Sequence, residues 1–187
     1  TFQRIKPKTI EDVMLGLSLF RPGPKEELER FLENRSNGTT SLRNLKGDPI
    51  EGAEDLTPVV RNTYGIVVYQ EQVMEIAQLW AKYSLGEADL LRNIISKKKT
   101  KKMQEEKEKF FQRSKQNNRT EKSTKEIFEI IERFSEYGFN KSHAAEYSMI
   151  TYETAYLKAN FPLEFYVTQL NENIKKFSVT KETLWEM

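Results

Sequence analysis

Apolar residues recur along most of the chain at the three- and four-residue spacing of amphipathic helices, with polar residues between them. This spacing predicts helices over residues 9–20, 24–36, 57–64, 70–82, 84–95, 103–119, 123–137, 142–158 and 162–173. Residues 37–56 are rich in Gly, Asn, Ser and Asp and predict a long surface loop. The β-branched run 66–69 fits either a strand or a buried approach to the next helix. No strand-rich section and no internal repeat is visible, so the sequence predicts an elongated all-α fold that follows a polar lead-in over residues 1–8.

Polar residues and prolines predict where several helices begin and end. Three pairs have the spacing of a capping box: Thr9 with Asp12, Ser84 with Glu87, and Ser123 with Glu126. The first helix is expected to stop at residues 21–24, Arg-Pro-Gly-Pro, because proline removes an N–H donor and restricts the residue before it. That stiff turn would hold Arg21 in a defined place, with Pro24 as the first residue of the second helix.

Residues 137–158 contain one helix end and the start of the next helix. Gly138 is expected to end its helix in the left-handed conformation, and Ser142 is expected to cap the helix that follows. The apolar positions of this second helix are Ala145, Met149, Tyr152 and Tyr156. Their spacing predicts one apolar face.

The start of the same helix carries a cation, an imidazole and a phenol, in Lys141, His143 and Tyr147. Such a helix start is suited to an anion, because its first N–H groups lack partners within the helix. Each residue also has a structural interpretation: a solvated lysine, a half-buried histidine with its hydrogen bonds satisfied, and a core tyrosine.

Composition excludes several classes of function. The chain has 187 residues, enough for one elongated domain or two small ones, and it has no cysteine and one histidine. Disulfides, the usual zinc sites and a Cys/His nucleophile are therefore excluded. No apolar run approaches the length of a membrane helix, so a cytoplasmic protein without membrane contact is expected.

The charge is unevenly distributed along the chain. The net charge is +2, but residues 92–122 hold twelve basic and four acidic residues and the remainder is acidic. A segregated basic segment is typical of phosphate or nucleic-acid binding. The alternative is a solvated helix with pairs such as Glu105–Lys109, which accounts for residues 103–119 better than for Lys97, Lys98 and Lys99.

Four stretches, taken in order, resemble a known family. They are Leu-Phe-Arg-Pro-Gly-Pro at 19–24, Thr-Tyr-Gly-Ile-Val-Val-Tyr-Gln-Glu-Gln-Val-Met at 63–74, Gly-Glu-Ala-Asp-Leu-Leu-Arg at 86–92, and Tyr-Gly-Phe-Asn-Lys-Ser-His-Ala-Ala at 137–145. Together they resemble the fingers region of the alpha subunit of bacterial DNA polymerase III, the C-family replicative polymerase. The likeness covers about residues 5 to 171 and is closer to the branch without an inserted proofreading exonuclease. It implies a fingers domain over residues 1–173, with 174–187 as a linker or the start of the next region.

The resemblance implies binding of an incoming dNTP and the nascent base pair. Arg92 matches the first arginine of a family Arg-Arg pair, with Asn93 in the second position, and residues 95–98 stand where the family usually has Met-Gly-Lys-Lys. Glu146 stands where alanine is more common. The nucleotide-binding residues implied are Arg21, Arg92, Lys97, Lys98, Lys141, Ser142, His143 and Tyr147. The DNA-binding residues implied are Lys99, Lys101 and Lys102.

The resemblance also implies partners and a division of labour. In such a subunit the palm would bind Mg²⁺ through an Asp-x-Asp pair, which does not occur in these residues. The chain is therefore expected to be a monomer that binds and positions dNTP and primer–template DNA without catalysing synthesis, while the complete subunit meets the sliding clamp and other replisome proteins. Two other interpretations stay open: a stand-alone basic nucleic-acid-binding module, and a helical interaction domain whose lysines only increase solubility.

Overall fold

The computed structural model describes residues 2–20, 25–96, 100–134 and 138–173. The regular elements in these residues are all helical, with two isolated bridges in place of strands, which confirms the all-α class. The elements are α1 (Phe2–Ile5), α2 (Ile10–Leu19), α3 (Lys25–Ser36), η1 (Glu54–Leu56), α4 (Thr57–Val60), η2 (Arg61–Thr63), α5 (Gln70–Ala81), α6 (Leu85–Ser96), α7 (Thr100–Gln116), α8 (Glu121–Phe134), α9 (Lys141–Asn160) and α10 (Pro162–Asn173). The turn predicted at 21–24 lies outside the described residues.

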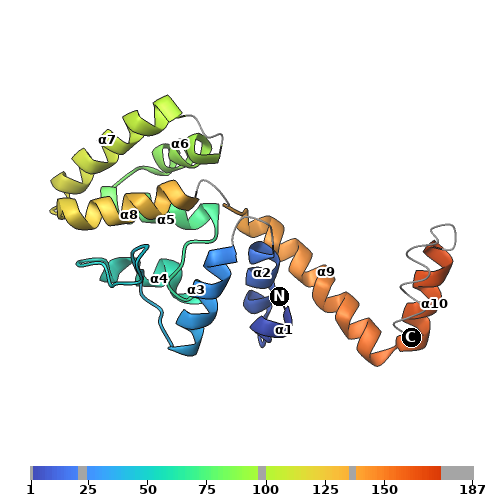
Figure 1. Cartoon of the computed structure of the whole chain (residues 1–187). Helices are drawn as coiled ribbons and strands as arrows, with labels where there is room; N and C mark the ends of the chain where they lie inside the picture. Colours follow the sequence, from blue (N-terminus) through green and yellow to red (C-terminus); the bar gives the residue numbers. More distant parts are fainter. Residues whose placement is uncertain (1, 21–24, 97–99, 135–137, 174–187) are drawn as a thin grey trace.

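The larger apolar core lies among α5, α6, α7 and α8, which gather at one end of the molecule (Figure 1). Trp80, Phe110 and Phe128 are buried there with almost no exposed surface. Trp80 of α5 donates its Nε1–H to Thr124 Oγ1 of α8 at 3.2 Å, so its one polar atom is satisfied. The apolar stripe predicted for residues 70–82 is thus the inner face of α5.

A second, smaller core joins α1, α2 and α3 to the segment 66–69. The chain start is not the polar lead-in predicted from the sequence, because α1 places Ile5 in this core beside Leu15. A Cβ atom at Gly16 would lie 2.4 Å from the Phe2 ring. The missing side chain at Gly16 therefore lets α1 lie close against α2.

Two of the three predicted capping boxes are present. Thr9 caps α2, with Asp12 N–H donating to Thr9 Oγ1 and Thr9 N–H donating to Asp12 Oδ2, each at 3.3 Å. Ser84 precedes α6 in the same way, since its N–H donates to Glu87 Oε2 at 2.9 Å and Glu87 N–H donates to Ser84 Oγ at 3.4 Å. These side chains satisfy N–H groups that have no partner within the helix.

The third predicted capping box is wrong. Helix α8 begins at Glu121, and Ser123 N–H donates to Thr120 Oγ1 at 3.1 Å, so Thr120 is the capping residue. Ser123 is buried within the first turn, and Glu126 reaches away to accept a hydrogen bond from Asn44 Nδ2 at 3.1 Å. The tertiary contacts of these two side chains override the local spacing signal.

The extended segment 66–69 connects the two cores. Val67 faces the larger core, whereas Ile66 and Val68 face the smaller one, as alternation along an extended chain requires. The Gln72 side chain fixes this segment, because its Oε1 accepts the N–H groups of Val68 and Tyr69 at 2.8 and 2.9 Å. The predicted ambiguity is thus resolved as a buried approach to α5.

Helix α9 starts one residue earlier than predicted, and its cap is Asn140 rather than Ser142. Asn140 Oδ1 accepts the His143 N–H at 2.9 Å, and α9 begins at Lys141. The prediction of a left-handed Gly138 is also wrong, since its φ lies outside the positive region. A Cβ atom at Gly138 would lie 2.4 Å from the Phe134 ring, and this close approach accounts for the glycine.

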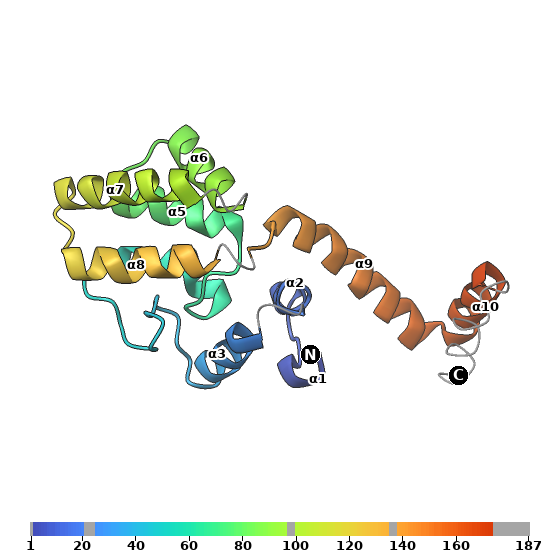
Figure 2. The same ribbon diagram turned by 45° about the horizontal axis from the view of Figure 1, so that its top comes forward.

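Helix α9 projects from the two cores and carries α10 at its far end (Figure 1 and Figure 2). It contacts α2 through Ala144 and Ser148, which are buried. The face predicted to be apolar is exposed, with Met149, Tyr152 and Tyr156 each at least 50% accessible. An apolar groove of about 650 Å³ lies between this part of α9 and the start of α2.

Candidate functional site

The structure describes six of the eleven residues implied as sites in full: Arg92, Lys102, Lys141, Ser142, His143 and Tyr147. Lys101 lies in α7, but its side chain is outside the description. Arg21, Lys97, Lys98 and Lys99 lie outside the described residues altogether. The site is therefore built from Arg92 on α6 and from the start of α9.

Arg92 lies on α6 with its side chain 28% exposed and its guanidinium held from two directions. Asp89, one turn earlier, accepts from Nε at 2.9 Å and from Nη2 at 2.7 Å, both through Oδ1. Gln70, at the start of α5, accepts from Nη1 through its side-chain Oε1 at 3.2 Å. The two acceptors come from different helices and together orient the planar guanidinium group.

Asn93, which stands in place of the second family arginine, takes part in the same network. Its Nδ2 donates to Asp89 Oδ2 at 3.0 Å. The Nε and Nη2 groups of Arg92 donate to the other carboxylate oxygen, Oδ1. Asn93 thereby orients Asp89, which in turn holds Arg92. Asn93 thus contributes a hydrogen bond to Asp89 and no charge.

Gln70 also joins α6 to the approach of α9. Its backbone N–H donates to the Phe139 carbonyl at 2.8 Å, and Phe139 N–H donates to the Val68 carbonyl at 3.2 Å. These two bonds form the parallel bridge between residues 69 and 139. The two parts of the expected nucleotide site, about 50 residues apart in sequence, are thus connected through one residue.

The start of α9 presents a row of aromatic rings. The Phe139 and His143 ring centroids lie 5.5 Å apart, and those of His143 and Tyr147 lie 4.4 Å apart. Tyr147 is 53% exposed, so the interpretation of this residue as a core tyrosine is wrong. His143 and Ser142 are exposed as well. This row offers flat surfaces and polar edges to a ligand beside the Arg92 network.

Two of the first three N–H groups of α9, those of Lys141 and His143, already have acceptors in this structure. Both carboxylate oxygens of Glu71 accept from Lys141 N–H, at 3.2 and 3.0 Å, and Asn140 accepts from His143 N–H. The Lys141 ammonium lies 5.9 Å from the centre of the Tyr69 ring. An anion at this helix start would therefore be met mainly by side chains, or would compete with Glu71.

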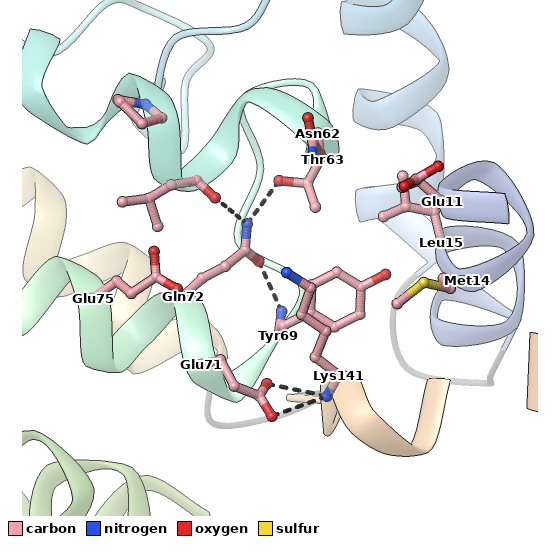
Figure 3. A pocket seen from close by; sticks show the side chains of 12 residues that line it. Glu11, Met14, Leu15, Asn62, Thr63, Tyr69, Glu71, Gln72, Glu75 and Lys141 are labelled. Atoms are coloured by element: carbon pink, nitrogen blue, oxygen red, sulfur yellow. Dashed lines mark hydrogen bonds between the residues drawn. The ribbon is translucent and has the colours of Figure 1, made fainter. Parts of the chain in front are cut away.

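A cavity of about 190 Å³ lies behind this helix start, between α2, α4 and α5 (Figure 3). Figure 3 shows Glu71 turned toward Lys141 on one side, and Gln72 bonded to Thr63 and to the backbone on the other. Tyr69 lines the cavity and is buried, and this burial raises the pKa of its phenol to about 12. The cavity is therefore lined by residues of α2, α4, α5 and the start of α9.

Three basic residues of α7 are paired with acids on neighbouring helices. Lys107 contacts Glu132 at 3.1 Å, and Lys109 contacts Glu87 at 3.1 Å rather than the expected Glu105. Arg113 also binds Glu87, at 2.6 Å. Ion pairs within the fold therefore account for this part of the basic segment. The solvated-helix alternative also expected ion pairs here, but between other residues.

Comparisons with known proteins show the family of the chain. Residues 1–118 match the family model for the bacterial DNA polymerase III alpha subunit finger domain. The chain belongs to this finger domain family. Proteins called DNA polymerase III subunit alpha are 42% identical over 171 residues in Thermus aquaticus, 44% over 168 in Mycoplasma genitalium and 41% over 172 in Caulobacter vibrioides. These alignments cover 90% or 91% of the chain but only 14% to 18% of each relative, so the chain spans less than a fifth of their length.

Two features are absent from the part of the chain that the structure describes. In those residues no group of three or more His, Cys, Asp or Glu is placed to hold a metal ion. No helix among them is long and apolar enough to cross a membrane.

Sequence reasoning missed three members of the site: Gln70, Glu71 and Asp89. All three fall inside the stretches that resemble the family, at 63–74 and 86–92. Glu71 lies in the first turn of its own helix α5, where its charge favours the positive end of the helix dipole. Its bond to α9 depends on a contact across 70 residues, which no local spacing signals.

Proposed function

We propose that this domain holds the triphosphate and base of an incoming dNTP during template-directed DNA synthesis by a complete polymerase subunit. The supporting observation is that Gln70 connects Arg92 on α6 to the approach of α9. Two groups of residues implied as nucleotide contacts by separate motifs are thus joined by hydrogen bonds through one residue. In this proposal the domain covers residues 1–173.

The chemistry of each side chain determines which part of the nucleotide it is proposed to contact. Arg92 presents a permanently charged planar donor that is suited to phosphate oxygens, and Asp89 and Gln70 fix its plane. Lys141 adds charge, while His143 and Tyr147 offer rings for the sugar or the nascent base pair. Lys97 and Lys98 add charge for the triphosphate, and Lys99, Lys101 and Lys102 meet the DNA backbone in the same proposal.

The metal chemistry belongs to another part of the subunit in this proposal. Phosphoryl transfer of this kind uses Mg²⁺ ions bound by carboxylates, and we assign those to the palm. The described residues offer no fitting carboxylate cluster, so the domain's share is binding and positioning. Primer–template DNA, the sliding clamp and other replisome proteins are the partners we assign to the complete cytoplasmic subunit.

The test is incorporation of single nucleotides by the complete subunit carrying point substitutions. Arg92→Ala should lower kcat and weaken dNTP binding, because its charge complements the departing pyrophosphate. Tyr147→Ala should mainly raise KM, and Tyr147→Phe should be mild because only the hydroxyl is lost. Lys122→Ala, which removes an exposed cation on α8, is the matched control and should be neutral. Near-normal kinetics for both Arg92→Ala and Tyr147→Ala would overturn the proposal.

A further inference from the structure

The first turn of α5 contacts several separate parts of the molecule through consecutive residues. Gln70 bonds to Arg92 of α6 and to the carbonyl of Phe139. Glu71 bonds to the first residue of α9. Gln72 bonds to the carbonyl of Val59 and to the hydroxyl of Thr63 at 2.9 and 2.8 Å. This turn is therefore the place where α6, α9 and the α4 region take their relative positions.

We infer that Gln70 is a positioning residue that sets the Arg92 guanidinium relative to the start of α9. The inference rests on the proposed function and adds a residue that acts through Arg92 on the triphosphate. Its side chain reaches Arg92 while its backbone N–H holds the Phe139 carbonyl, two residues before α9 begins. Any movement of Gln70 would therefore move the Arg92 guanidinium and the aromatic row at the start of α9 together.

The geometry explains why a second acceptor matters at this position. An arginine side chain is long and rotates about several bonds, so a single carboxylate one turn away on the same helix leaves its outer end free to swing. Asp89 uses one oxygen, Oδ1, to meet Nε and Nη2 of Arg92. Gln70 meets the remaining nitrogen, Nη1, from another helix. Contacts at all three nitrogens fix both the plane and the direction of the guanidinium group.

The amide of Gln70 also suits the charge balance. Asp89 already places one negative charge beside Arg92, and a second carboxylate would cancel the positive charge that attracts phosphate. An amide oxygen accepts the hydrogen bond without carrying a formal charge. Gln70 can therefore hold Arg92 in place and leave its attraction for a triphosphate intact.

The test is a double-mutant cycle in the complete polymerase subunit, measured as kcat and KM for single-nucleotide incorporation. Gln70→Leu keeps the side-chain volume and removes the acceptor, so kcat/KM should fall about fivefold to tenfold. In an Arg92→Ala background the same change should have less than about a twofold effect, because the group it positions is gone. Gln70→Glu keeps the acceptor but adds charge, so it should raise KM, with a smaller effect on kcat.

Each outcome separates this inference from the proposed function. If Arg92→Ala alone leaves kinetics unchanged, Gln70 has no phosphate contact to position and this inference is wrong, whereas the proposed function is wrong only if Tyr147→Ala is near normal as well. If Arg92→Ala is harmful but Gln70→Leu is neutral, or is equally harmful with and without Arg92, the positioning role of Gln70 is wrong and the proposed function stands. Thermal melting of each variant gives the structural control, since a general loss of folding would lower kcat/KM in both backgrounds.

Discussion

Glu71 and Lys141 lie 70 residues apart, yet both carboxylate oxygens of Glu71 accept the backbone N–H of Lys141, at 3.2 and 3.0 Å. The same carboxylate lies in the first turn of α5. It therefore faces the positive ends of two helices at once, and each helix dipole favours its negative charge. One side chain thus fastens the start of α9 to the start of α5.

Removal of this carboxylate should weaken the attachment of α9. Glu71→Ala should lower the free energy of unfolding by about 1 kcal/mol, because a charged hydrogen bond at a partly exposed helix end is lost. Glu71→Gln should cost less, since it keeps an acceptor. Urea unfolding followed by circular dichroism measures both. Glu75→Ala, an exposed acid that lines the same cavity, is the control and should change stability by less than about 0.5 kcal/mol.

Stability should fall in acid through Glu87. The Ser84 backbone N–H, the Lys109 ammonium and the Ser84 hydroxyl favour its ionised form and lower its pKa to about 2. A carboxylate with a depressed pKa in the folded state stabilises the fold above its ordinary pKa near 4.5, and this contribution is lost as pH falls toward 2. The urea midpoint should therefore decrease from pH 5 to pH 2.

Glu87→Gln should flatten that acid dependence, whereas Glu105→Gln, an exposed acid on α7, should leave it unchanged. A pH profile for Glu87→Gln that parallels the original chain would contradict the role assigned to Glu87.

Gly65 should not tolerate a side chain. Its φ is +79°, and an added Cβ atom would lie 2.3 Å from the Ser41 carbonyl oxygen, which is backbone and cannot turn away. Gly65→Ala should lower the free energy of unfolding by about 2 kcal/mol or more. Gly86→Ala is the matched control, because nothing lies within 4 Å of the added atom and α6 gains helix propensity. It should stabilise the chain by about 0.5 to 1 kcal/mol.

DNA binding should depend on salt through Lys97, Lys98 and Lys99. Replacing all three with alanine should reduce the slope of log K against log salt by as much as about 2.7, at about 0.9 for each phosphate contact. Fluorescence anisotropy with a labelled primer–template at several salt concentrations measures the slope. The control is Lys107→Ala with Lys109→Ala, which removes two lysines already paired with acids. Equal slopes before and after the triple change would show that Lys97 to Lys99 do not meet phosphate.

Helix positions could be predicted from the sequence wherever the signal was local. The spacing of apolar residues gave the helix over 70–82, and Thr9 and Ser84 were correctly identified as caps. These predictions need only side chains within one turn of one another. They succeed because capping and amphipathic spacing depend on nearby residues.

Predictions failed where distant contacts decide between local alternatives. Asn140 and Ser142 could both cap a helix, and the bridge between Tyr69 and Phe139 fixes the approach so that Asn140 occupies the capping position. The Gln70–Arg92 bond joins two residues that lie 22 positions apart in the sequence and on different helices. No periodicity in the sequence indicates such a contact, although the family resemblance had already drawn attention to both stretches.

Helix α9 joins the expected nucleotide surface at one end to α10 at the other (Figure 1). It has 20 residues, so at about 1.5 Å per residue it is about 30 Å long. Its two buried residues, Ala144 and Ser148, and its bond to Glu71 lie in its first half. A rigid rotation of α9 about its start would make the helix a lever with its pivot near Lys141. A tilt of about 10° at that pivot would move the start of α10 by about 5 Å, so a small change on binding at one end becomes a large displacement at the other.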